Sequence, residues 1–488
     1  MIGRRSDTEA SRKPLPYVLI VTGFAIIIGG GIAFALVGRN EGTVSARTSA
    51  EFSFSSSTKT DDDDFVVDEM RGDAEINAGA STTPSIRPSG VPLPSSLLTA
   101  TVVPTPNPSS HAPTDGKSYH TIIVGAGAAG LSAAYTLQNE GLKLPSEEIH
   151  ILESASTLGG RVQKDTTFAP YPLDVGASFV QYDEAIEAIV GADRLAEPAG
   201  TGLPVFVNYT WWDFFDEFIA PKDKETVIEY GCRVILVDYT NNDVDDENKV
   251  ITKCKDGRTF VSNHVIITVP LPILRDRVID FRPPLPTSMT TGHPGLPQWE
   301  GFKVFLELQT ADFLRENHIE SIAPDGYLTE TGENLFWKQH GALDNGNEII
   351  AGYLLGDQSN SYIDLDDESI IQEMLALLDD QYNGKASRLY IRGIVKNWSK
   401  DMNIKGTLST FGYDKGGSGY PSGAQNVYNM NKLWIAGEAF PVDGSNGWVD
   451  SGVFSGDDAA KQIIDLTQEP RAGLDDLFWK RVKKNLIG

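Results

Sequence analysis

The chain has 488 residues, with 41 Lys plus Arg against 67 Asp plus Glu, and its formal net charge is −26. This length exceeds what one hydrophobic core usually organises, which predicts two structural units with further sequence around them. The acidic balance argues against nucleic-acid binding, because phosphate contacts need a basic surface, and it suits small cationic molecules, although solubility is the plainer explanation of the charge.

Residues 14–38 contain no charged side chain and are mainly apolar. A helix of this length, at about 1.5 Å per residue, crosses a hydrocarbon layer of about 30 Å, so the segment predicts a transmembrane helix. A cleaved signal peptide is the alternative, but its apolar region is shorter, at about 7 to 15 residues, and no clear A-x-A cleavage site follows. The basic residues before the span are Arg4, Arg5, Arg12 and Lys13.

By the positive-inside rule, these basic residues predict a cytosolic tail over residues 1–13 and a lumenal or extracellular catalytic part in the secretory pathway. Residues 39–118 are rich in Ser, Thr and Pro, contain the acidic run Asp61–Asp64 and have few large apolar side chains. Such sequence cannot build a core, so we expect a disordered, semi-extended stalk there.

Cys232 and Cys254 are the two cysteines of the chain. Neither belongs to a C-x-x-C motif or to a cluster with metal-ligand spacing, and the seven histidines are scattered. The sequence therefore predicts no metal site and no disulfide framework, while a single disulfide remains compatible with it.

A glycine-rich motif follows the stalk. The β-branched run Thr121–Val124 leads into Gly125, Gly127 and Gly130, spaced G-x-G-x-x-G, and Ala- and Leu-rich helical sequence comes next. In this strand, turn and helix, Gly125 permits the turn, Gly127 lets the backbone approach a pyrophosphate, and Gly130 lets helix and strand pack closely. The unpaired N–H groups of the helix N-terminus attract the same anion.

A second predicted strand ends at Glu153, close to the spacing expected for the acid that binds a ribose hydroxyl. The paired glycines Gly159 and Gly160 then let the chain pass near a cofactor, and the guanidinium of Arg161 is suited to neutralise pyrophosphate charge. The glycine motif and Glu153 predict a dinucleotide, and the segment Gly159–Arg161 favours FAD over NAD.

With these blocks in place, the sequence resembles the flavin-dependent amine oxidase family, from residue 119 to about residue 466. Two further blocks carry the resemblance: Asp174–Val180, similar to the family's G-A-x-W segment, and Leu433–Phe440, similar to its F-A-G-E block. The resemblance implies an α/β fold, with a Rossmann-like FAD-binding domain and an inserted, abbreviated α+β substrate domain. Within the flavin domain of residues 119–488, we expect the FAD-binding parts at about 119–181, 227–275 and 425–470, and the substrate part at about 182–226 and 276–424.

The resemblance also implies cofactor contacts. The family holds adenine through the backbone of a valine that matches Val234, and its glutamate on the ribityl chain matches Glu438. The segment that contains Val449 is similar to the one that runs under the isoalloxazine and opens a helix, whose N-terminus favours electron density on the reduced flavin. Neither cysteine lies near Leu408, so we expect the FAD to be bound non-covalently.

Four residues are candidates for the reaction itself. Lys303 interrupts a mainly apolar strand, where a buried ammonium is costly without a partner or a function, and it matches the family lysine that contacts the flavin N5 through a water. The family flanks the substrate amine with aromatic rings, and the matching positions are Leu408 and Trp448, so one side is aliphatic. Trp398 matches another recurrent aromatic, although a packed core tryptophan explains it nearly as well.

The resemblance implies oxidation of an amine. A hydride equivalent passes from the carbon beside the amine nitrogen to the flavin N5, O2 is reduced to H2O2, and the imine is hydrolysed to an aldehyde. A polyamine suits an acidic protein, and other primary or secondary amines remain open. Two alternatives share the cofactor motifs: a flavin desaturase or protoporphyrinogen-type oxidase, and a membrane-tethered FAD-binding domain without turnover. The second is raised by the short segment between Phe179 and Val227, where relatives insert a long helical part.

Overall fold

The computed structural model divides the chain into two units, Met1–Ser96 and Leu97–Gly488, and each is treated by itself. The structure describes residues 23–28, 31–36, 117–140, 144–145, 148–197, 203–222, 227–240, 249–290, 298–309, 321–322, 332–339, 343–409, 423–442, 446–466 and 478–487.

In the first unit, β1 (Gly23–Ile28) and β2 (Gly31–Leu36) form an antiparallel pair with Ile28 opposite Gly31. The expectation of a helix is therefore wrong for these residues. Two glycines separate the strands in the sequence and β-branched isoleucines precede them, and both features favour a hairpin. The parts of the chain that the structure describes contain no helix long and apolar enough to cross a membrane. The rest of the expected span, the tail and the stalk up to residue 116 lie outside the described residues.

The second unit contains a nine-stranded sheet, here called the cofactor sheet, in which the order β13-β10-β11-β12-β3-β4-β9 is extended beside β12 by β20 and β19. Strands β3, β4, β9, β12 and β20 are mutually parallel, with Val124 opposite both Leu152 and Ile267. Their carboxyl ends therefore meet at one edge, the edge at which open α/β sheets bind ligands. The strand bounds are β3 (Ser118–Val124), β4 (Ile149–Leu152), β9 (Val227–Glu229), β10 (Val234–Asp238), β11 (Val250–Cys254), β12 (Thr259–Ile267), β13 (Asp280–Arg282), β19 (Gln425–Asn426) and β20 (Leu433–Ile435). Since β13 pairs with β10, this sheet reaches beyond the boundary expected at residue 275.

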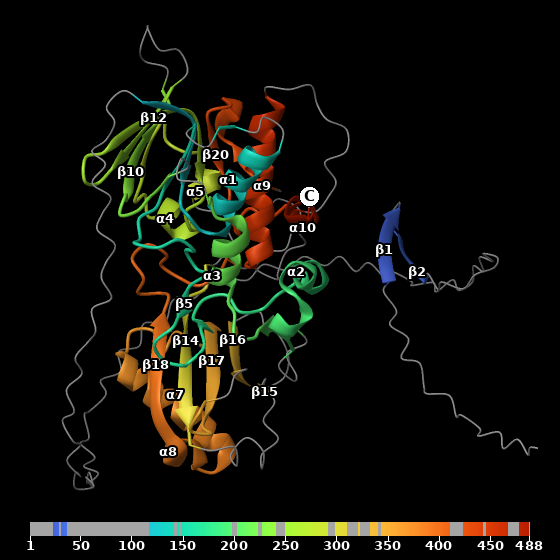
Figure 1. Cartoon of the computed structure of the whole chain (residues 1–488), viewed down its shortest axis with the longest axis vertical. Coiled ribbons are helices and arrows are strands. Elements are labelled where there is room, and N and C mark those ends of the chain that lie inside the picture. The colour runs from blue at the N-terminus through green and yellow to red at the C-terminus, as the bar shows by residue number, and fades with distance from the viewer. Residues whose placement is uncertain are drawn as a thin grey trace, which may run out of the picture. The chain divides into compact units, whose positions relative to one another are not determined.

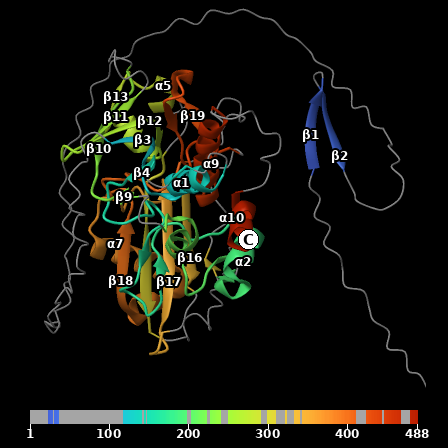
Figure 2. The ribbon, with the colours of Figure 1, turned by 45° about the horizontal axis from the view of Figure 1, so that its top comes forward.

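Helices α1 (Ala128–Asn139) and α9 (Val449–Asp465) pack against each other beside the cofactor sheet (Figure 1, Figure 2). Their contact is close because α9 has a glycine at the crossing: a Cβ on Gly456 would lie 2.0 Å from the carbonyl oxygen of Ala129. Buried Ala and Leu side chains of α1, such as Leu131 and Leu137, join buried residues of the strands and of α9 in one core.

The abbreviated segment after Phe179 packs into this same core. It contains α2 (Asp183–Val190), η2 (Ala192–Arg194), β7 (Leu195–Ala196), β8 (Val205–Phe206), α3 (Trp211–Phe214) and the π-helical turn η3 (Phe215–Ile219). The ring of Phe214 lies 5.4 Å from that of Trp479 in α10 (Phe478–Ile487). A sequence expected to form part of the substrate domain thus contributes to the core beneath the cofactor sheet.

A second, antiparallel sheet has the order β15-β16-β17-β14-β18 and is here called the substrate sheet (Figure 1). One face of β14 (Gly301–Leu308) packs against α7 (Asp367–Tyr382) through Phe302, Val304 and Leu306. The opposite face packs against residues 168–175, which lie in the chain between β4 and β9. The bounds are β15 (Ser321–Ile322), β16 (Gly332–Lys338), β17 (Glu348–Gly356), β14 (Gly301–Leu308), β18 (Tyr390–Asn397), α7 (Asp367–Tyr382) and α8 (Lys385–Leu389), with β5 (Lys164–Asp165), β6 (Leu173–Asp174), α4 (Leu271–Arg275), α5 (Thr287–Thr290) and η4 (Val427–Asn429) in the connections.

The α1–α9 crossing yields a stability prediction. Gly456→Ala places a methyl group against the Ala129 backbone, which cannot move aside as a flexible side chain would, so we expect the free energy of unfolding to fall by about 2 kcal/mol. Urea unfolding followed by far-UV circular dichroism measures this. Gly452→Ala, one turn earlier, is the control because its nearest neighbour would lie 3.7 Å away. Equal stability of both variants would contradict the packing argument.

Candidate active site

A cavity of about 270 Å³, here called the main cavity, opens at the carboxyl edge of the cofactor sheet and extends to Lys303 near the start of β14. The residues predicted from the sequence that line it are Gly125, Gly127, Glu153, Gly160, Arg161, Lys303, Trp398, Leu408, Glu438, Trp448 and Val449. Val234 lines a smaller adjoining cavity of about 50 Å³, and Gly130 lies beneath the glycine turn. Among the described residues, no group of three or more His, Cys, Asp or Glu is arranged to hold a metal ion.

The glycine turn between β3 and α1 is required by sterics at two of its three positions. Gly125 has φ +109°, and a Cβ there would lie 2.6 Å from Oγ1 of Thr268. A Cβ on Gly130 would lie 1.9 Å from the carbonyl oxygen of Gly125, so strand and helix approach only with glycine. At Gly127 the nearest atom would be 3.8 Å away, so protein packing does not demand glycine there, and the space above it is available to a ligand.

Two helix N-termini face the main cavity. Gly127 precedes α1 and Trp448 precedes α9, and neither N-terminus is capped by a side-chain hydrogen bond. Ala128 and Ala129 of α1 and Val449 of α9 line the cavity. Uncapped N–H groups and the helix dipoles therefore favour an electron-rich or anionic group at both places.

Glu153 follows β4 and is buried, with 6% of its surface exposed. Its carboxylate accepts hydrogen bonds from the backbone N–H of Ala126 at 2.7 Å and of Ala155 at 2.7 Å. Burial raises the pKa of Glu153, and these N–H donors oppose that rise. The protein thus holds the carboxylate in one orientation at the wall of the main cavity.

Arg161 and Glu438 form an ion pair at the middle of the cavity. Nη1 of Arg161 donates to Oε1 of Glu438 at 2.7 Å and to the carbonyl of Thr407 at 2.8 Å. Glu438 also accepts from the N–H and the hydroxyl of Ser409 and from the N–H of Gly447 at 3.0 Å. The sequence predicted separate cofactor contacts for Arg161 and Glu438 but not their ion pair. It also did not predict the hydrogen bonds that Thr407 and Ser409 make to this pair, because no local pattern indicates them.

Lys303 lies on β14 with 1% of its surface exposed. Its Nζ donates to the hydroxyl of Ser178 and, at 3.3 Å, to the carbonyl of Asp174. Burial lowers the pKa of Lys303 to about 7, and the nearby Asp174 carboxyl opposes that shift. Burial also raises the pKa of Asp174, opposed in turn by Lys303. A lysine that changes protonation near neutral pH therefore lies at the cavity wall.

Around Lys303, the main cavity has apolar and aromatic walls, here called the apolar chamber: Phe179, Tyr353, Leu355, Trp398, Leu408 and Trp448. Trp398 lines the cavity and also belongs to the buried core. It is 2% exposed, and its Nε1 donates to the carbonyl of Val175 at 3.0 Å. Leu408 and the residue before Trp448 are neighbours, since a Cβ on Gly447 would lie 3.2 Å from Cδ1 of Leu408. Tyr353 and Leu355 were not predicted from the sequence.

Comparison with known proteins identifies the family to which this chain belongs. A family model described as flavin containing amine oxidoreductase matches residues 214–464, and one described as NAD(P)-binding Rossmann-like domain matches residues 123–190. The chain belongs to the flavin-containing amine oxidase family.

Relatives and solved structures agree with this assignment. Polyamine oxidase 5 of Oryza sativa subsp. japonica is 26% identical over 463 residues, covering 73% of this chain and 90% of that protein. Probable polyamine oxidase 4 of Arabidopsis thaliana is 27% identical over 232 residues, but the match covers 47% of this chain and only 43% of the relative. A redesigned putrescine oxidase has the same fold, with a TM-score of 0.51 at 15% identity, covering 72% of this chain and 99% of that chain.

FAD is the cofactor of this amine oxidase, and the geometry fits it. The space above Gly127, the two uncapped helix N-termini and the held carboxylate of Glu153 lie along one continuous cavity. A pyrophosphate is suited to the N-terminus of α1, a ribose to Glu153 and an electron-rich ring to the N-terminus of α9.

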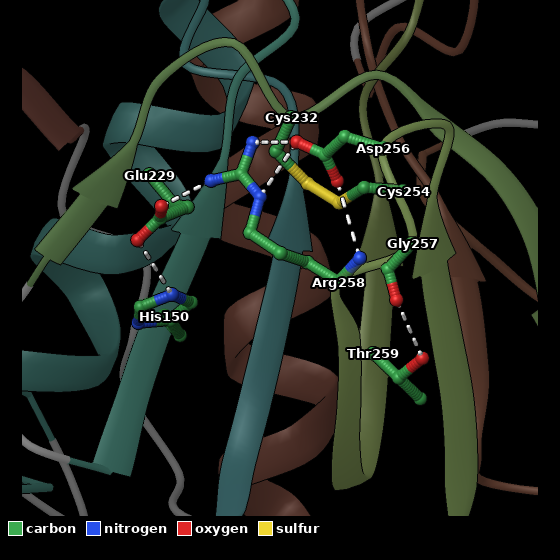
Figure 3. Close-up of a disulfide and its surroundings, with 8 residues drawn as sticks. All are labelled: His150, Glu229, Cys232, Cys254, Asp256, Gly257, Arg258 and Thr259. Atoms are coloured by element: carbon green, nitrogen blue, oxygen red, sulfur yellow. Dashed lines mark hydrogen bonds and ion pairs between the residues drawn. A yellow bond between two sulfur atoms is a disulfide. The ribbon is translucent and has the colours of Figure 1, made fainter. Parts of the chain in front are cut away.

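A disulfide joins Cys232 and Cys254 beside the smaller cavity that Val234 lines, and their Cα atoms lie 5.3 Å apart (Figure 3). The bond connects the turn between β9 and β10 with the end of β11. The N–H of Cys232 donates to the carbonyl of Glu153 at 2.9 Å, and that of Gly231 donates to the carbonyl of Ala155 at 3.0 Å. The disulfide therefore tethers the turn against which the Glu153 backbone is held. Both cysteines are engaged in it.

A charged cluster lies next to the disulfide. Arg258 reaches between Glu229 and Asp256 and pairs with both carboxylates (Figure 3). His150 lies 3.8 Å from Glu229, but burial lowers its pKa to about 4, so the imidazole is neutral at neutral pH and the contact is not an ion pair. The cluster links β4, β9 and the β11–β12 turn.

The Arg161–Glu438 pair yields a binding prediction. Arg161→Ala leaves the buried Glu438 carboxylate without its cationic partner, so we expect FAD to bind about 10-fold more weakly, and Glu438→Gln to have an effect of similar size. Because the pair acts as one unit, the double variant should lose much less than the sum of the two losses. Titration of the apoprotein with FAD, followed by flavin fluorescence, measures all three. Strictly additive losses would show that the two side chains act independently.

Proposed function

We propose that this amine oxidase oxidises a primary or secondary amine in the apolar chamber. The observation that carries the proposal is the buried Lys303, which lies in the same cavity as the dinucleotide motif and among aromatic walls. When bound, FAD accepts a hydride equivalent from the carbon beside the amine nitrogen and passes the electrons to O2, so that H2O2 and an imine, hydrolysed to an aldehyde, are the products.

The chamber walls favour the reactive form of the substrate. Hydride loss requires a neutral amine, whose nitrogen keeps its lone pair. Apolar surroundings disfavour an ammonium and lower the pKa of a bound amine, because the charged form loses its hydration there. Trp448 and Leu408 line the chamber, and in this proposal they exclude water from the amine and restrict its orientation.

Lys303 is suited to handle a proton. Its hydrogen bonds to the Ser178 hydroxyl and the Asp174 carbonyl hold Nζ at the chamber wall, and its pKa near 7 allows it to give or take a proton at neutral pH. Several relatives are named as polyamine oxidases, which supports an amine as the substrate of this chain.

We also infer that the flavin domain operates in an oxidising compartment, lumenal or extracellular. The Cys232–Cys254 disulfide supports this, because such bonds persist in oxidising compartments and are rare in the cytosol. Alkylation of free thiols in protein isolated from its native compartment, followed by mass spectrometry, tests it. We expect both cysteines to resist alkylation until a reductant is added, and two free thiols in the isolated protein would contradict the inference.

Lys303→Met tests the catalytic assignment. We expect flavin reduction or reoxidation to slow about 10-fold or more, with FAD still bound, because methionine keeps the shape but cannot carry a proton. The wild type should show a titration near pH 7, with Lys303 protonated below and neutral above, and the variant should lack it. Anaerobic stopped-flow bleaching by amines and reaction of the reduced enzyme with O2, each across pH, measure the two half-reactions.

Lys338→Met is the control for this experiment, because Lys338 lies on the same sheet, is 44% exposed and pairs with Glu348. Unchanged kinetics in Lys303→Met would remove Lys303 from the reaction. A wild-type protein that retains FAD but is bleached by no amine would contradict amine oxidation itself and support an FAD-binding domain without turnover.

A further inference from the structure

The register of the substrate sheet places Tyr353 beside Lys303. The two residues are directly opposite on the antiparallel strands β17 and β14, and the ring centre of Tyr353 lies 5.2 Å from Nζ of Lys303. Leu355 is two residues further along β17 and lies on the same face. Both residues line the main cavity, so this edge of β17 forms one wall of the apolar chamber.

The aromatic walls already face lysine ammonium groups. Besides Lys303 beside Tyr353, Lys396 lies over the ring of Trp398 with Nζ 4.3 Å from the ring centre. Lys396 is already paired with Asp401, with Nζ 2.9 Å from Oδ2, so lysine side chains of the protein engage both these aromatic faces and this carboxylate. The six residues of the apolar chamber include no carboxylate, so the distal ammonium of a diamine or polyamine would lose its hydration there without gaining a counter-charge from them.

The chamber suits an apolar substituent. Leu355 and Trp398 are buried, while Phe179, Tyr353, Leu408 and Trp448 are half-buried and leave part of their apolar surface towards the cavity. A hydrocarbon or aryl group that covers this surface removes apolar area of both the protein and the substrate from water. An ammonium group, by contrast, loses its hydration there.

We propose that Tyr353 contacts the substrate and determines specificity, and that the preferred substrate is a monoamine with an apolar alkyl or aryl group rather than a polyamine. The proposal rests on the proposed amine oxidation and adds the substrate class. Tyr353 supplies an aromatic wall in a chamber where Leu408 is aliphatic.

Two amines of equal chain length provide the test. n-Hexylamine and 1,6-diaminohexane differ only in the distal amino group, so their kcat/KM ratio in the FAD-loaded protein reports the cost of the second charge. We expect n-hexylamine to be preferred about 10-fold or more, and 2-phenylethylamine to be accepted as well. A preference for the diamine, or for spermidine, would overturn the inference while leaving amine oxidation intact. Flavin bleaching by no amine would overturn both.

Variants at one position test the residue. Tyr353→Ala should raise KM for n-hexylamine and 2-phenylethylamine about 10-fold with a smaller change in kcat, because it removes a binding wall. Tyr353→Phe keeps the wall and should restore the wild-type KM, and Tyr353→Glu should shift the preference towards 1,6-diaminohexane by supplying a counter-charge.

Ile350→Val is the matched control on β17, because Ile350 is buried with the α7 side of the sheet and lies outside the chamber lining. It should leave the amine preference unchanged. If Tyr353→Ala and Tyr353→Glu both retain the wild-type KM and preference while binding FAD, Tyr353 does not contact the substrate and the assignment fails. If Tyr353→Ala does not fold, a Tyr353→Glu variant that binds FAD and retains the wild-type KM and preference is enough to defeat the assignment.

Discussion

The parallel pairing of β3 with β4 and β12, and of β12 with β20, is the constraint on which the rest of the site depends. It brings Val124, Leu152, Ile267 and Ile435 to one edge of the sheet, so that the residues after them meet although they are far apart in the chain. The carbonyl of Gly125 then leaves no room for a side chain at Gly130, which sets α1 directly against the strand. A slip of one residue in this pairing would separate the glycine turn from Glu153 and Glu438.

The second constraint is a buried cation. Lys303 lies within an apolar strand, where its charged form is unfavourable, and a hydroxyl, a carbonyl, a nearby carboxyl and the rings of Trp337 and Tyr353 compensate its charge in part. Between its folded pKa near 7 and the unfolded value near 10.5, the unfolded chain binds the extra proton, so this residue makes the folded state more stable as the pH rises. At neutral pH the protein thus retains a group that costs stability and supplies proton chemistry.

Much of the cofactor half followed from local sequence. The glycine spacing, Glu153 and Glu438 each mark a strand end, and parallel strands place their ends together. The substrate half did not follow in the same way. The opposition of Tyr353 and Lys303 is a matter of register between distant strands, and the Arg161–Glu438 pair joins residues whose local motifs point to separate roles. The segment after Phe179 was expected in the substrate domain, yet its aromatic residues pack against α10.

The sequence by itself determined the dinucleotide-binding turn, the likeness to the amine oxidases and a lysine out of place in an apolar strand, because these depend on the chemistry of adjacent residues. Apolarity alone did not determine conformation at the N-terminus, where β1 and β2 replace an expected helix, since the same residues suit either state. Only the tertiary structure decided which side chains surround Lys303 and that Cys232 joins Cys254. Those contacts arise from strand register and from segments far apart in the chain, and no local pattern encodes them.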